Sequence, residues 1–182
     1  PDELAIIDRL MRIGEAIHAA SWDFVRPGMT EHDLYQRVHD VALEAAGEPI
    51  TMRCGIKASP VAQQSSAAPI LTDGMLVILD MFPVLNGYRC DITNTICVGG
   101  KPSKRQQFLF DLCKQAMAAG EKMLRPGVRA NDVYAAVNSV FTEAGEAHLF
   151  PHHAGHAIGL AHPEPPYFIP GDDEVIVENA VF

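Results

Sequence analysis

Hydrophobic side chains recur at intervals of three and four residues in four stretches of the chain, two in each half. Such spacing places one apolar face of a helix against a core. The predicted helices are residues 3–24, 31–46, 103–124 and 130–145. Thr30 with Asp33, and Ser103 with Gln106, have the spacing of capping residues at helix starts. The pattern therefore predicts four amphipathic helices with two capped N-termini.

Two strands joined by a tight turn are predicted in the middle of the chain. Residues 75–82 are mostly apolar, and residues 88–98 are rich in β-branched side chains. Between them lies Asn86-Gly87, the strongest short-range signal for a hairpin. Weaker signals predict a further strand pair, formed by residues 148–160 and 173–182. They also predict a loop at residues 58–70.

The chain contains an internal repeat at an offset of 99 residues. Residues 26–45 align without a gap with residues 125–144, and nine of the 20 positions are identical. Both copies begin with Arg-Pro-Gly, which two unrelated amphipathic helices would not share. Two copies are too few for a solenoid. We therefore expect a single domain of two pseudo-symmetric halves, about 1–100 and 101–182.

Composition and charge narrow the class of protein. The 182 residues are 48% hydrophobic and 20% charged, which is typical of a globular domain. The formal net charge of −9 argues against a nucleic-acid partner and against an anionic membrane surface. No apolar run reaches the roughly 20 residues that span a bilayer, and no signal peptide is recognisable. The four cysteines form no C-x-x-C pair, which favours free, buried thiols in a reducing, cytoplasmic setting.

Asp80 and Asp91 are the first candidates for chemistry. Asp80 interrupts an apolar strand, where an unpaired carboxylate is strongly unfavourable or becomes protonated. One hairpin register pairs Asp80 with Thr93, and another pairs it with Asp91. Either register puts both carboxylates on one face of the sheet, because side chains alternate along a strand. Two explanations stay open: a divalent cation between the carboxylates, or pairing of Asp80 with Arg53 or Arg89.

Histidines gather near the end of the chain. Five of the eight lie within 15 positions: His148, His152, His153, His156 and His162. A lone histidine is usually a hydrogen-bonded core residue, but a cluster among glycines that admit close backbone approach favours a functional site. If residues 152–160 are extended, His152 and His156 share one face and His153 points away. The other three histidines lie on predicted helices and are expected to be solvated or hydrogen-bonded: His18, His32 and His39.

Two motifs resemble those of the pita-bread metallopeptidases, a family that includes Xaa-Pro aminopeptidase, prolidase, methionine aminopeptidase and creatinase. Residues 87–95 (GYRCDITNT) are similar to G-Y-x-x-D-x-T-R-T, and residues 152–160 (HHAGHAIGL) are similar to H-x-x-G-H-G-I-G-L. The resemblance covers essentially the whole chain and is closest to the Xaa-Pro branch. It implies an α/β (α+β) pita-bread fold of two pseudo-symmetric halves. It also implies metal-dependent hydrolysis of peptide bonds by an Xaa-Pro aminopeptidase or dipeptidase.

The resemblance implies roles for five residues. Asp80, Asp91 and His156 match ligands of a site for two divalent metal ions, for which carboxylates with imidazole suit Mn, Co, Zn or Fe. Manganese is the expected metal. His152 and His162 match histidines that contact the substrate or stabilise the tetrahedral intermediate. A peptide or small-molecule substrate and a homodimer are expected.

Several family features have no match in this chain. The remaining family ligands are two glutamates, one of them in an E-P-G motif, and neither Glu174 nor Glu178 matches them. Asn94 stands where the family usually has arginine. We therefore expect a catalytic domain that lacks its C-terminal end, is inactive as it stands, and follows an N-terminal domain. The alternatives are creatinase-like hydrolysis of a small amide or guanidino substrate, and a non-catalytic binding protein of the same fold.

Overall fold

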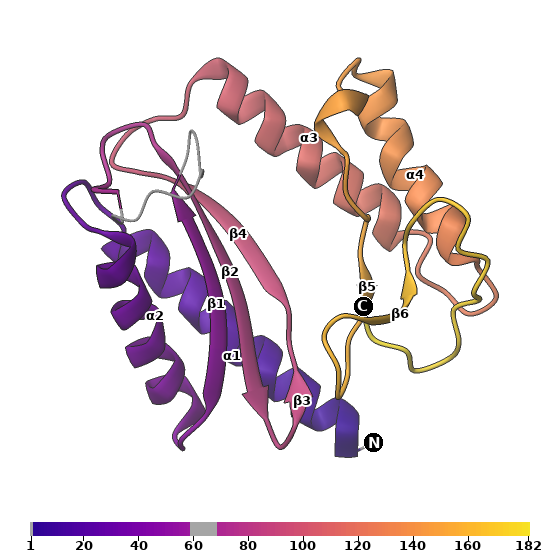
Figure 1. Cartoon of the computed structure of the whole chain (residues 1–182), viewed down its shortest axis with the longest axis horizontal. Helices are drawn as coiled ribbons and strands as arrows, with labels where there is room; N and C mark the ends of the chain where they lie inside the picture. The colour runs from indigo at the N-terminus through magenta and orange to yellow at the C-terminus, as the bar shows by residue number, and fades with distance from the viewer. Residues whose placement is uncertain (1, 59–68) are drawn as a thin grey trace. The chain divides into compact units, whose positions relative to one another are not determined.

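The computed structural model describes residues 2–58 and 69–182, which separate into two compact units. Figure 1 shows the elements of the first unit, Pro1–Pro102, and of the second, Ser103–Phe182. Most of the loop predicted at residues 58–70 lies outside the described residues. Within the described ranges, no helix combines the length and the apolar character needed to cross a membrane.

The first unit packs two helices against an antiparallel sheet (Figure 1). Its elements are α1 (Asp2–Phe24), α2 (Glu31–Ala46), β1 (Thr51–Ala58), β2 (Leu76–Leu85), β3 (Tyr88–Arg89) and β4 (Ile92–Cys97). β2 pairs with β1 on one side and with β3 and β4 on the other. Alternate β2 side chains, Val77, Leu79 and Met81, are fully buried in a core shared with both helices. The intervening β2 residues face away from the helices, because strand side chains alternate.

The predicted hairpin turn at Asn86-Gly87 is confirmed. Both residues have positive φ, 51° and 86°, as a two-residue hairpin turn of type I′ requires. The register pairs Asp80 with Thr93, the first of the two registers that the sequence allowed. Asp91 therefore lies one diagonal from Asp80 and not directly opposite it.

The strand predicted at residues 88–98 is interrupted. Cys90 and Asp91 belong to neither β3 nor β4. The Cys90 N–H donates to the Pro83 carbonyl at 3.2 Å. Pro83 has no N–H to return a ladder hydrogen bond, so the pairing is weakened at this position.

The second unit contains α3 (Lys104–Glu121), α4 (Ala130–Glu143), a 3₁₀ turn (Ala147–Leu149), β5 (His156–Ala157) and β6 (Glu164–Tyr167). The two helices pack through Leu112, Ala116, Val137 and Phe141, and a second cluster surrounds Ala130, Val133, Phe168 and Ile176. Of the strand predicted at 148–160, only β5 forms, and it pairs with β6. The strand predicted at 173–182 is wrong. Residues 174–176 instead form hydrogen bonds with the loop before α4.

The four predicted helices and both capping boxes are confirmed. The prediction missed β1, although polar and apolar residues alternate in it, because Gly55 has a low strand propensity and interrupts the run. Trp22 is 54% exposed. Its position on α1 lies outside the stripe that faces the sheet.

A short backbone frame precedes α2 in the first unit. The Gly28 N–H donates to the Leu71 carbonyl at 2.9 Å, and the Leu71 N–H donates to the Met29 carbonyl at 2.7 Å. Gly28 has a φ of +89°. Thr30 and Ile70 form an isolated antiparallel bridge next to these bonds. The segment before α2 is thus fixed against a residue more than 40 positions away.

The same frame precedes α4 in the second unit. Gly127 donates to Ile176 at 3.0 Å, and Ile176 donates to Val128 at 2.8 Å. Gly127 has a φ of +91°, and Arg129 forms the matching bridge with Val175. Gly127, Val128 and Arg129 lie 99 residues after their counterparts in the first unit. The internal repeat in the sequence therefore extends to individual backbone hydrogen bonds.

Candidate metal and catalytic residues

Asp80 lies near the middle of β2 and is half-buried on the face that points away from the helices. The Thr93 hydroxyl donates a hydrogen bond to Asp80 Oδ1 at 2.6 Å. Gly55 of β1 pairs with Asp80 on its other side, and a Cβ at Gly55 would lie 3.3 Å from Asp80 Oδ2. The glycine therefore keeps space beside the carboxylate, and the threonine orients it.

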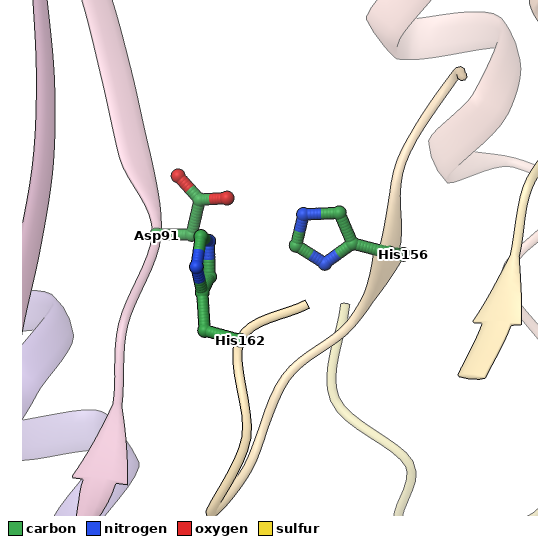
Figure 2. Close-up of side chains that lie close together, drawn as sticks. All are labelled: Asp91, His156 and His162. Atoms are coloured by element: carbon green, nitrogen blue, oxygen red, sulfur yellow. The ribbon is translucent and has the colours of Figure 1, made fainter. Parts of the chain in front are cut away.

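Asp91 projects from the interruption between β3 and β4 and is half-buried (Figure 2). Thr93 pairs with Asp80 and lies two residues after Asp91. Residues two apart share a face of a strand. The prediction that Asp80 and Asp91 share one face of the sheet is therefore confirmed by the register.

His156 is buried, with 9% of its surface exposed, and lies in β5. Its Nδ1 is 3.0 Å from the Ala157 carbonyl oxygen. Because a carbonyl can only accept, Nδ1 carries the proton in this hydrogen bond and the lone pair lies on Nε2. That tautomer fits an imidazole that binds a metal ion through Nε2.

The histidine cluster forms a series of neighbouring rings within the second unit. The rings of His156 and His162 meet edge to face, with centroids 5.1 Å apart (Figure 2). The ring centroids of His153 and His156 are 5.2 Å apart, and those of His152 and His153 are 3.9 Å apart. The extended conformation considered for residues 152–160 is not observed, because only His156 and Ala157 are in a strand. His152 is exposed and His162 is half-buried.

Two glycines of the histidine motif permit close packing, as the sequence indicated. A Cβ at Gly155 would lie 2.9 Å from the Phe168 ring, and one at Gly159 would lie 2.7 Å from Glu164 Oε1. Glu164 also accepts a hydrogen bond from the Ala161 N–H at 3.1 Å. The motif therefore follows a path that larger residues would obstruct.

The four cysteines are free thiols, and the prediction that they are buried holds fully only for Cys90. Cys113 is exposed. Burial raises the pKa of the Cys90 thiol to about 12, with a smaller contribution from Asp91. Burial also raises the pKa of Cys54 to about 11, helped by the charge of Asp80. Protonated thiols of this kind are poor nucleophiles and metal ligands.

His18 was expected only to be solvated or hydrogen-bonded, and the structure gives it a specific backbone partner. It lies on α1, is 7% exposed, and places Nε2 3.1 Å from the Ile92 carbonyl oxygen. Burial lowers its pKa, an effect that the Ile92 hydrogen bond and the charge of Asp80 oppose. Nothing in the sequence indicates this hydrogen bond, beyond the presence of a histidine on an apolar helical face.

Carboxylates on one sheet face and a series of imidazoles are donor groups typical of a metal-dependent enzyme. Residues 5–182 match the profile of metallopeptidase family M24. The chain belongs to this family.

The chain is similar to curated proteins that bear peptidase names. It is 33% identical over 183 residues to the protein named probable dipeptidase PepE of Mycobacterium tuberculosis, covering 97% of the chain and 48% of that protein. It is 25% identical to the Xaa-Pro dipeptidase of Pyrococcus furiosus, covering 99% of the chain and 52% of the relative. The chain thus spans about half the length of these curated relatives.

Solved structures show the fold. A prolidase from Thermococcus sibiricus superimposes with a TM-score of 0.89 at 21% identity, covering 98% of this chain and 50% of the other. A prolidase from Pyrococcus furiosus gives a TM-score of 0.87 at 24% identity, with coverage of 98% and 54%. The predicted α+β pita-bread fold is therefore confirmed.

Proposed function

We propose that the protein is a metal-dependent peptidase of the Xaa-Pro type and that this chain is part of its single catalytic domain. The observation that carries the proposal is the M24 match over residues 5–182. The PepE and Xaa-Pro dipeptidase relatives support peptide bonds as the substrate class, and a proline after the scissile bond is the finer proposal. Creatinase-like hydrolysis and a binding role remain as outcomes of the test below.

Asp80, Asp91 and His156 are the proposed metal ligands. The shared face of the two carboxylates and the His156 tautomer support this assignment, each within its own unit. Two like charges on one half-buried face repel, and a divalent cation between them would offset that repulsion. The mixed carboxylate and imidazole set supports two ions of the Mn, Co, Zn or Fe type, with manganese the proposed metal.

Bound divalent ions would supply an activated water and polarise the scissile carbonyl. The chain's own contribution is to hold and orient these groups. The Thr93 hydroxyl fixes one Asp80 carboxylate oxygen and so orients the carboxylate toward the proposed metal ion. His152 and His162 are proposed to contact the substrate and to donate hydrogen bonds to the negative charge that develops on the carbonyl oxygen. The half-buried position of His162, edge-on to His156, supports this role.

We infer a homodimer in the cytoplasm, supported by the expectations from the family resemblance and from the cysteine pattern. Sedimentation of the full-length protein measures its oligomeric state, and fractionation of cells that express it measures its location. A monomer at micromolar concentration would contradict the dimer.

The test uses the full-length protein and a dipeptide with proline in the second position. Hydrolysis should disappear with a chelator and return with Mn²⁺. Asp91→Asn should abolish hydrolysis and weaken metal binding. Asp111→Asn is the matched control, because Asp111 is an exposed carboxylate on α3 that accepts a hydrogen bond from Gln107 at 3.0 Å.

Each alternative predicts a different result in the same experiment. Turnover of a small amide or guanidino substrate that survives the chelator would support creatinase-like chemistry. Metal binding without hydrolysis of any dipeptide would support a binding protein. Equal loss in the Asp91→Asn and Asp111→Asn variants would contradict the assignment of Asp91 as a ligand.

A further inference from the structure

One stripe of α1 holds the segment that carries Asp91. The Cys90 thiol donates to Met11 Sδ at 3.5 Å. A Cβ at Gly14 would lie 3.2 Å from Ile92 Cγ2 and 3.5 Å from Cys90 Sγ, so the glycine lets the segment approach the helix closely. His18, one helical turn after Gly14, contacts the Ile92 carbonyl. The residues on both sides of Asp91 are therefore fixed by the same helical face.

The direction of the Asp91 side chain follows from these contacts. Cys90 is fully buried, Ile92 is half-buried, and both point toward α1. Side chains alternate along an extended backbone, so Asp91 points to the opposite face. Because the ladder is weakened at Pro83, the contacts with α1 contribute much of the constraint on this short stretch.

His18 provides the polar part of this support. Its Nε2 must donate to the Ile92 carbonyl, because a carbonyl oxygen only accepts. Its Nδ1 is buried and has no hydrogen-bond partner among the described residues. A buried polar atom without a partner destabilises the folded state. A leucine would fill the position without that cost, so packing alone does not account for an imidazole here.

The internal repeat shows that a helix at this place in the fold does not require a histidine. The position 99 residues after His18 is Met117, which is 63% exposed. The core positions of the same helices do correspond, since Ile13 and Ile17 match Leu112 and Ala116, and all four are buried. The imidazole is thus specific to the unit in which the helix lies against the segment that carries a proposed metal ligand.

We propose that His18 is a positioning residue, whose hydrogen bond to the Ile92 carbonyl fixes the backbone from which Asp91 reaches a divalent metal ion. This inference rests on the proposed metal site and assigns that site a supporting residue on α1. Residues that orient metal ligands from outside the ligand set typically change metal affinity by about 10–100-fold when they are replaced.

Calorimetric titration of the full-length protein with Mn²⁺ tests the proposal. His18→Leu removes the donor and should weaken Mn²⁺ binding by about tenfold or more. His18→Gln keeps an N–H donor of similar reach and should restore most of the affinity. Ser21→Ala is the matched control, because the buried Ser21 hydroxyl donates within its own helix to the Ile17 carbonyl at 2.7 Å.

Gly14→Ala is a second way to move the same segment if His18→Leu does not fold. Its Cβ would displace Ile92 by a few tenths of an ångström, and weaker Mn²⁺ binding by the folded variant is expected. Wild-type affinity in folded His18→Leu, or in folded Gly14→Ala, would overturn the positioning role alone. Absence of Mn²⁺ binding by the unaltered protein would overturn the proposed metal site, and the positioning role with it.

Discussion

Gly28→Ala tests whether the frame before α2 depends on a left-handed backbone. Gly28 has a φ of +89°, and a Cβ built there would have no neighbour within 4 Å. The substitution therefore introduces no collision, and its effect is purely conformational. An L-residue in a left-handed conformation costs about 1–2 kcal/mol. Reduced freedom of the unfolded chain offsets about 0.4–1 kcal/mol of that.

The expected net loss is therefore about 1 kcal/mol in the free energy of unfolding. Urea denaturation followed by the fluorescence of Trp22 measures it, because Trp22 is the one tryptophan and lies in the same unit. Gly100→Ala is the control. Gly100 has no positive φ, and the nearest atom to its Cβ position is 3.8 Å away, so alanine should be neutral or slightly stabilising.

An unchanged or higher urea midpoint for Gly28→Ala would contradict the expected cost of the left-handed backbone. An equal loss in the Gly100→Ala variant would also refute it, because the loss would then not depend on φ. Gly127→Ala should behave like Gly28→Ala, since its φ is +91° and its Cβ position is equally open. Hydrogen exchange at the Ile176 amide reports the change in that unit.

Other residues give independent tests. Thr30→Ala removes the capping box of α2 and should lower the free energy of unfolding by about 1 kcal/mol in urea denaturation, whereas an unchanged midpoint would contradict the cap. In native protein at pH 8, iodoacetamide should modify the exposed Cys113 before the buried Cys90, because burial raises the pKa of Cys90 to about 12, and mass spectrometry of peptides gives the order. Arg105 binds Glu146 through both carboxylate oxygens, which lowers the pKa of Glu146. Stability from this pair is present above the ordinary pKa of 4.5 and is lost as pH falls through the lower folded-state pKa, so Glu146→Gln should flatten the acid limb of a pH–stability profile.

The helices and the hairpin could be predicted because their signals are local. The capping box of Thr30 and Asp33 lies within four residues, and Asn86-Gly87 alone determines the turn. The strand predicted at 173–182 did not form, because this segment makes its hydrogen bonds with the loop before α4, far away in the sequence. Ile176 bonds to Val128, and no property of residues 173–182 indicates that pairing.

The candidate site was predictable to the extent that it depends on alternation. Asp80 and Asp91 share a face in either hairpin register, so their relation followed from the sequence. His18 did not, because its importance depends on which strand segment lies against α1. A histidine on an apolar helical stripe looks the same in sequence whether its ring is solvated, packed or bonded to the backbone beside a ligand.

The frames at Gly28 and Gly127 place the same backbone geometry in two different surroundings within one protein. Each frame has the same hydrogen bonds, and the two glycines have nearly the same φ, +89° and +91°. Matched substitutions can therefore be compared within one polypeptide, in the same buffer and at the same temperature. Any difference between the two variants would report the surroundings of each frame and not its backbone geometry.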